Sequence, residues 1–147
     1  MVLADPPLGD ALECRRAEPI ILALVAERLG VKLTRDPMQV GGTARVDVDG
    51  VDADRSVFVE VFAHVGRLKG GQRHKVSNDA LKLITLGREH PNARLVIAFA
   101  DAEAAAFTIG RSWLAVALRS AGIEVVVADI DDALRDELRG AQKRLYR

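Results

Sequence analysis

Two short, almost uninterrupted apolar runs most constrain the fold of this chain: residues 93–100 (ARLVIAFA) and 123–129 (IEVVVAD). Runs of this length and composition are typical of strands buried on both faces of a sheet. A helical pattern over residues 102–121 separates them. We therefore expect two parallel strands joined by a right-handed crossover, which is the basic unit of an α/β fold.

A β-hairpin is predicted before these strands. Residues 43–49 (TARVDVD) alternate apolar and polar side chains, residues 50–55 (GVDADR) are turn-forming, and residues 56–65 (SVFVEVFAHV) are rich in β-branched and aromatic types. Helices are predicted over residues 10–29, 72–89, 102–121 and 131–145. The predicted order is α-β-β-α-β-α-β-α, and it favours a three-layer α/β/α architecture with a central mixed sheet.

The size and composition of the chain fit one globular domain. It has 147 residues, of which 49% are apolar, so we expect a single domain over 1–147 with a flexible N-terminus at 1–9. Its one cysteine, Cys14, cannot form an internal disulfide, and no apolar stretch reaches the roughly 18 residues of a membrane span. We therefore expect a cytoplasmic protein without membrane contact. The formal net charge is zero, which disfavours a protein that coats DNA.

Glu60 stands in the middle of an apolar strand, where an unpaired carboxylate is costly to bury. With the turn centred near Asp52, Asp47 comes within about one or two residues of lying beside Glu60. Two adjacent carboxylates repel unless a cation lies between them, and Mg²⁺ accepts one or two carboxylates together with water and phosphate oxygens. The alternative is that Asp47 and Asp49 face solvent while Glu60 pairs with an arginine such as Arg45.

A basic segment follows the hairpin. Between His64 and Ser77 there is no acid, and the cations are Arg67, Lys69, Arg73 and Lys75. The next helix carries a polar stripe at helical spacing, formed by Gln72, Lys75, Asp79 and Lys82. Either this stripe aims its amide and ammonium groups at the hairpin acids, or it is an exposed face with helix-spaced ion pairs.

Acids on two adjacent strands, a basic loop and the helix QRHKVSNDALKL together resemble the PD-(D/E)XK, or restriction-endonuclease-like, superfamily. The resemblance covers residues 10–100 well. It implies that Asp47 and Glu60 are the two metal-binding acids, with Asp49 as the alternative to Asp47. Glu18 resembles the first-helix glutamate of archaeal Holliday-junction resolvases, which implies a further metal ligand.

One position departs from the pattern of the family. Its lysine should stand two residues after the second acid, where this chain has Phe62. Some members supply the lysine from the next helix instead. Lys75 is the best placed for that role, with Lys82 and Lys69 behind it, and His64 shares the strand face of Glu60.

The resemblance implies a nuclease that uses Mg²⁺ or Mn²⁺ to hydrolyse phosphodiester bonds, with Asp47, Glu60 and Lys75 as its catalytic residues. Nucleic acid, expected to be DNA, would contact the segment 64–82 through Arg67, Lys69, Gln72, Arg73, Lys82 and His64. The alternatives are a non-catalytic nucleic-acid-binding module and a protein-interaction module that acts as a homodimer. Trp113, in an alanine-rich helix, is expected either in the core or as an interface anchor.

Overall fold

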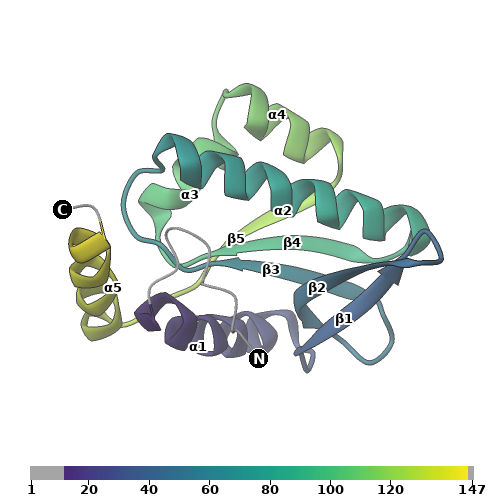
Figure 1. Cartoon of the computed structure of the whole chain (residues 1–147), viewed down its shortest axis with the longest axis horizontal. Helices are drawn as coiled ribbons and strands as arrows, with labels where there is room; N and C mark the ends of the chain where they lie inside the picture. The colour runs from purple at the N-terminus through teal and green to yellow at the C-terminus, as the bar shows by residue number, and fades with distance from the viewer. Residues whose placement is uncertain (1–11, 146–147) are drawn as a thin grey trace.

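The computed structural model of the protein describes residues 12–145 (Figure 1). In chain order its elements are α1 (Leu12–Leu29), β1 (Thr34–Val40), β2 (Ala44–Val51), β3 (Val57–Phe62), α2 (Gly70–Glu89), β4 (Arg94–Phe99), α3 (Ala102–Ile109), α4 (Trp113–Ser120), β5 (Ile123–Val127) and α5 (Asp132–Leu145). The strands form one five-stranded sheet in the order β1-β2-β3-β4-β5. The pairs β1–β2 and β2–β3 are antiparallel, and the pairs β3–β4 and β4–β5 are parallel. The protein therefore has an α/β fold with a mixed sheet.

The structure confirms the predicted hairpin and the predicted parallel pair, but it corrects the predicted element order at two points. Strand β1 was not predicted because Pro37 and its polar neighbours do not resemble a strand, although proline is tolerated on an edge strand such as this one. The helix predicted over 102–121 is two helices, α3 and α4. They are separated because Ser112 begins a new helix, its Oγ accepting from Ala115 N at 3.1 Å as an N-cap.

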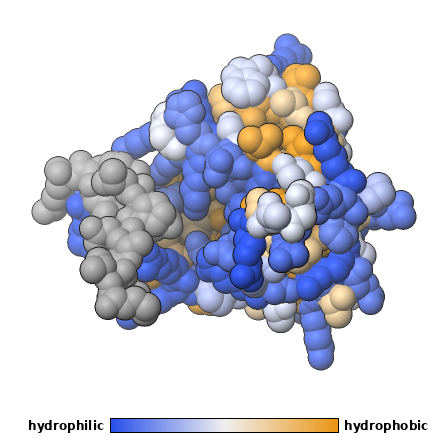
Figure 2. All heavy atoms as spheres, turned by 45° about the vertical axis from the view of Figure 1, so that its right-hand side comes forward, coloured by the Kyte–Doolittle hydropathy of each residue, from blue (hydrophilic) through white to orange (hydrophobic). Residues whose placement is uncertain are grey.

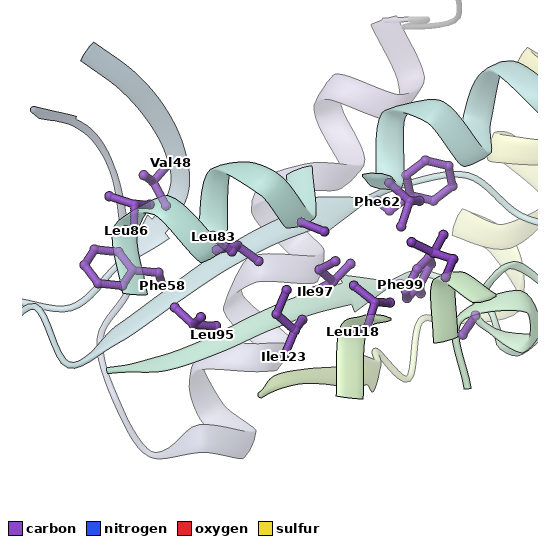
Figure 3. Packing of buried hydrophobic residues seen from close by; sticks show 14 of the residues in the cluster. Val48, Phe58, Phe62, Leu83, Leu86, Leu95, Ile97, Phe99, Leu118 and Ile123 are labelled. Carbon is purple, nitrogen blue, oxygen red and sulfur yellow. The ribbon is translucent and has the colours of Figure 1, made fainter. Parts of the chain in front are cut away.

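Helices cover both faces of the sheet, as Figure 1 shows. On one face α2, α3 and α4 pack over a core that includes Phe58, Leu83 and Phe99 (Figure 3). On the other face α1 and α5 pack over a second core that includes Ile21 and Val59. The inner strands β3 and β4 are thus buried on both sides, which explains their continuous apolar runs.

The central strand β3 divides its side chains between these two cores. Val57, Val59 and Val61 belong to the core under α1, whereas Phe58 and Phe62 belong to the core under α2. Because side chains alternate along a strand, the residue between Phe58 and Phe62 on the α2 side is Glu60. The only ionisable residue of β3 is therefore directed toward helix α2.

Helix α1 continues through Pro19 and ends at Gly30, which has a φ of 70° and takes the left-handed conformation common at helix ends. The residues expected to form a flexible N-terminus, 1–9, lie outside the described part of the chain. Within residues 12–145, none of the helices combines the length and the apolar character that crossing a bilayer requires.

Trp113 does not lie in the core, because 72% of its surface is exposed. Ile109 and Val116 are exposed nearby on α3 and α4. Figure 2 shows apolar side chains gathered toward the top of the molecule, where Figure 1 places α4. The core interpretation of Trp113 is therefore wrong, and its role as an interface anchor stays a prediction.

Candidate functional site

A cleft of about 800 Å³ opens beside β2 and β3, between α1 and α2. Both helices contribute charged side chains to its wall, and strands β2 and β3 contribute the acids Asp49 and Glu60. Its lining residues are Arg15, Glu18, Pro19, Leu22, Leu33, Thr34, Arg35, Asp49, Glu60, Val61, Lys75, Asp79 and Lys82. The cleft therefore combines four acids with four cations on a partly apolar wall.

The cleft exists because β2 and β3 separate partway along their length. Their ladder consists of two residue pairs, the last of which joins Gly50 to Val59. Continuing this register by one residue brings Asp49 opposite Glu60. There the amide of Val61 donates to Asp49 Oδ2 at 2.8 Å rather than continuing the backbone ladder. The pairing of β1 with β2 also shifts register beside this point, as in a β-bulge.

Glu60 is the most deeply buried acid of the cleft, with 2% of its surface exposed. Lys82 Nζ lies 2.9 Å from its Oε1, an ion pair without hydrogen-bond geometry, and Oε1 has no hydrogen-bond partner within residues 12–145. Burial raises the pKa of Glu60 to about 9, and the charge and hydrogen bond of Asp49 and the charge of Asp79 act in the same direction, outweighing Lys82. The surroundings of Glu60 therefore favour its protonated form over the carboxylate.

Lys82 connects the helix to both strands of the hairpin. Its Nζ donates to the backbone carbonyl of Asp47 at 2.8 Å and also contacts Glu60. Burial opposes the charged ammonium, but the carboxyl groups of Glu60, Asp79 and Asp49 outweigh it and raise the pKa of Lys82. The ammonium therefore stays charged inside a cluster of acids.

The structure brings together most, but not all, of the predicted site. Glu18, Asp49, Glu60, Lys75 and Lys82 line the cleft. Asp47 does not line it: the side chain is exposed, and only its backbone carbonyl reaches Lys82. The acid opposite Glu60 is therefore Asp49, because the turn is centred on Asp54 and Arg55 rather than near Asp52.

Lys75 approaches the position where the family motif would have its lysine. Its Nζ lies 5.5 Å from the centre of the Phe62 ring. Phe62 itself is fully buried and packs against Phe99, with ring centres 5.5 Å apart. Lys75 therefore brings an ammonium group from α2 to this part of the cleft, whereas Phe62 of the strand packs in the core.

The remaining predicted nucleic-acid contacts lie apart from the cleft. Arg67, Lys69 and Gln72 line a second cavity, and Gln72 Oε1 accepts from Lys69 N at 2.9 Å at the start of α2. Arg73 stacks its guanidinium 4.1 Å from the centre of the Phe107 ring. His64 is buried, with its ring 4.9 Å from that of Phe62.

Three charged residues of the cleft were missed as site residues from the sequence. Arg15 lies one helical turn before Glu18, and this spacing could have identified it. Asp79 was seen in the polar stripe but was given no role. Arg35 belongs to β1, the strand that the sequence did not predict.

Whether the cleft fits a divalent ion depends on the oxygen ligands that its side chains offer. Within residues 12–145, no group of three or more His, Cys, Asp or Glu side chains is arranged to hold a metal ion. Mg²⁺ nevertheless needs only one or two carboxylates when water and phosphate oxygens complete its shell. Asp49 and the buried Glu60 Oε1, which lacks a hydrogen-bond partner in the described chain, fit that smaller requirement.

Comparisons with known proteins give no match, whether to a family model, to a curated protein or to a solved structure. The chemistry of the cleft is therefore inferred from its own side chains.

Proposed function

We propose that this protein is a divalent-metal-dependent nuclease with a three-layer, restriction-endonuclease-like architecture and its active site in the cleft. The observation that carries the proposal is the buried Glu60, opposite Asp49 where two strands separate. Groups with strongly perturbed pKa values, lying in a cleft, are candidates for catalysis. The mixed sheet with helices on both faces supports the architecture.

Asp49 and Glu60 would hold Mg²⁺ or Mn²⁺, with Glu18 as a further acid on the α1 wall of the cleft. Such an ion polarises the scissile phosphate and lowers the pKa of an attacking water. Glu60 must first release the proton that burial and Asp49 hold on it. Metal affinity should therefore rise with pH, because a ligand must be deprotonated before it binds.

The cations of the cleft serve the substrate. Lys82 and Lys75 can orient a water molecule and stabilise the negative charge that develops on the phosphorus centre, replacing the lysine missing at Phe62. Arg15 and Arg35 provide planar donors that suit phosphate oxygens. Contacts of this kind position a nucleic-acid strand without reading its sequence.

The test is Mg²⁺- or Mn²⁺-dependent cleavage of supercoiled plasmid DNA and of single-stranded RNA by purified protein. Glu60→Gln should lower the rate at least about 100-fold, because losing even an outer-shell partner costs a metal site 10–100-fold. Glu124→Gln is the matched control, since Glu124 pairs with Arg94 on the exposed surface, away from the cleft lining. The nuclease proposal fails if wild type cleaves neither substrate with either metal.

A non-catalytic nucleic-acid-binding module is the second candidate, and the contact between Lys82 and Glu60 favours it. An internal ammonium beside the carboxyl pair can take the place of the metal ion. This alternative predicts salt-sensitive nucleic-acid binding that persists in EDTA and is unchanged by Mg²⁺. The nuclease instead predicts Mg²⁺ binding that Glu60→Gln removes, measurable by titration calorimetry.

A further inference from the structure

A second cavity of about 510 Å³ lies between the start of α2 and helix α5. Its lining residues are Val65, Gly66, Arg67, Lys69, Gln72, Arg139, Gln142 and Lys143. Four of these are cations, and none of the lining residues within the described chain is acidic. The cavity thus differs from the cleft, whose wall includes both signs of charge.

Two glutamines fix the walls of this cavity. Gln142 accepts from Val65 N at 2.8 Å through Oε1 and donates to Val65 O at 2.9 Å through Nε2. This two-point contact attaches α5 to the chain just after β3. Arg139 and Lys143 lie four residues apart on α5 and flank Gln142, so the same contact turns both cations toward the cavity.

The opposite wall is equally constrained. Gln72 Oε1 accepts from Lys69 N, which holds the basic loop against the first turn of α2. Cations from two separate elements, Arg67 and Lys69 from the loop and Arg139 and Lys143 from α5, are thereby gathered around one hollow. Like charges held together repel, and a bound anion relieves that repulsion. The amino end of α2, at the rim, favours negative charge in the same place.

The two cavities are neighbours along one helix face. Gln72 lines the cationic cavity, and Lys75, three residues later on the same stripe, lines the cleft. Three residues advance a helix by roughly 4.5 Å. A polyanion that enters the cleft can therefore continue along α2 to the cationic cavity without leaving the protein surface.

We propose that the cationic cavity binds a backbone phosphate of the nucleic acid whose neighbouring segment occupies the cleft. This inference rests on the proposed function for the identity of the polyanion. It assigns Arg139 and Lys143 of α5 to nucleic-acid binding and extends the binding surface well beyond the 64–82 segment. The shared chemistry is that of a phosphate group, which free inorganic phosphate also carries, and the test below separates the two sources.

The experiment measures the binding of a fluorescent single-stranded oligonucleotide in EDTA across a series of salt concentrations. The double variant Arg139→Ala, Lys143→Ala should lose about one unit of slope in log K against log salt and bind about tenfold more weakly at low salt. The swap Arg139→Lys, Lys143→Arg should keep the wild-type slope. The matched control is Arg88→Ala, Arg111→Ala, which removes two exposed cations that line neither cavity and should change affinity less than about twofold.

The outcomes separate this inference from the nuclease proposal. If wild type cleaves with Mg²⁺ but the α5 double variant binds like the control, the phosphate subsite is wrong and the nuclease stands. If wild type cleaves nothing but the double variant has a smaller slope of log K against log salt, the phosphate subsite stands and the nuclease proposal fails. Failure of wild type to bind the oligonucleotide would overturn the inference, as would inorganic phosphate competing at a concentration equal to that of the oligonucleotide's own phosphates.

Discussion

Two glutamate ion pairs, one on the surface between β4 and β5 and one buried between β3 and α2, differ in exposure and in hydrogen bonding. On the surface, Arg94 of β4 and Glu124 of β5 form two hydrogen bonds, at 2.9 and 2.8 Å, with side chains 48% and 43% exposed. Inside, Glu60 of β3 and Lys82 of α2 approach to 2.9 Å with side chains 3% and 21% exposed. The first pair is bidentate, and the second leaves Glu60 Oε1 without a hydrogen bond in residues 12–145.

The pKa shifts of the two glutamates have opposite signs. The hydrogen bond from Arg94 lowers the pKa of Glu124, as expected for an acid that gains a cationic partner. Burial and the adjacent carboxyl groups raise the pKa of Glu60 to about 9 in spite of Lys82. A surface ion pair changes the free energy of unfolding by little, because both charges remain in contact with water. In the buried pair Lys82 favours the ionised carboxylate, but burial and the neighbouring acids outweigh it, so the pair stabilises the charged form of Glu60 only in part.

The largest expected effect is a pH-dependent gain in stability from Glu60→Gln. Glu60 titrates near 4.5 when unfolded and near 9 when folded, so between these values the folded state keeps a proton that the unfolded chain has released. Its contribution to the free energy of unfolding is therefore full below about pH 4.5 and falls as the pH rises toward 9. Relative to wild type, the variant should gain about 4 kcal/mol between pH 5 and pH 8, measured by urea unfolding at several pH values.

The surface pair supplies the control for that experiment. The lowered pKa of Glu124 means that its contribution is present above about pH 4.5 and is lost as the pH falls. Glu124→Gln should therefore cost less than about 1 kcal/mol at neutral pH and nothing at acid pH. A stability difference between Glu60→Gln and wild type that stays constant with pH would show that Glu60 is ionised in the folded protein.

The second expected effect is a loss of stability when the cation of each pair is replaced by methionine. Lys82→Met removes the ammonium that contacts Glu60 and the Asp47 carbonyl and takes its positive charge away from Asp49 and Asp79, so we expect a loss of about 3 kcal/mol at pH 7. Arg94→Met should cost about 0–1 kcal/mol. Added salt should reduce the Arg94 effect and leave the Lys82 effect almost unchanged, because buried charges are screened less. If urea unfolding shows that Lys82→Met and Arg94→Met lower the free energy of unfolding equally, the expected difference between the buried and the surface pair is wrong.

Much of the fold could be predicted because its signals are local. The apolar run at 93–100, the hairpin around residues 50–55 and the helix boundary at Gly30 each depend on nearby residues. Strand β1 could not be predicted, because its strand conformation comes from pairing with β2 rather than from its own composition, TRDPMQV. Tertiary context overrides propensity most easily in such an edge strand.

The candidate site was predictable in type but not in register. An acid inside an apolar strand pointed to Glu60, because burying a carboxyl group requires a physical reason, and the structure places Glu60 in the wall of the cleft. The choice between Asp47 and Asp49 depended on where the turn is centred, and Asp52 moves that centre by accepting from the backbone amides of Ser56 and Val57, at 2.7 and 2.9 Å. The cationic cavity was out of reach, because it depends on how α5 packs against residues far away in the sequence.

The smallest effect comes from Asp49→Asn, and it tests which acid of the hairpin belongs to Glu60. Asparagine can still accept from the Val61 amide but has no charge, so the free energy of unfolding at neutral pH should change by less than about 1 kcal/mol. Without the charge of Asp49 the pKa of Glu60 moves down toward its ordinary value, and burial keeps it from returning completely. The pH dependence of stability should become shallower than in wild type, and Mg²⁺ affinity by calorimetry should fall at least about tenfold.

Asp47→Asn should change neither, because that side chain is exposed and only its backbone carbonyl contacts Lys82. If Asp47→Asn weakens Mg²⁺ binding and Asp49→Asn does not, the acid pair is the one that the sequence motif indicated, and the hairpin in solution has a register two residues away from the one described above.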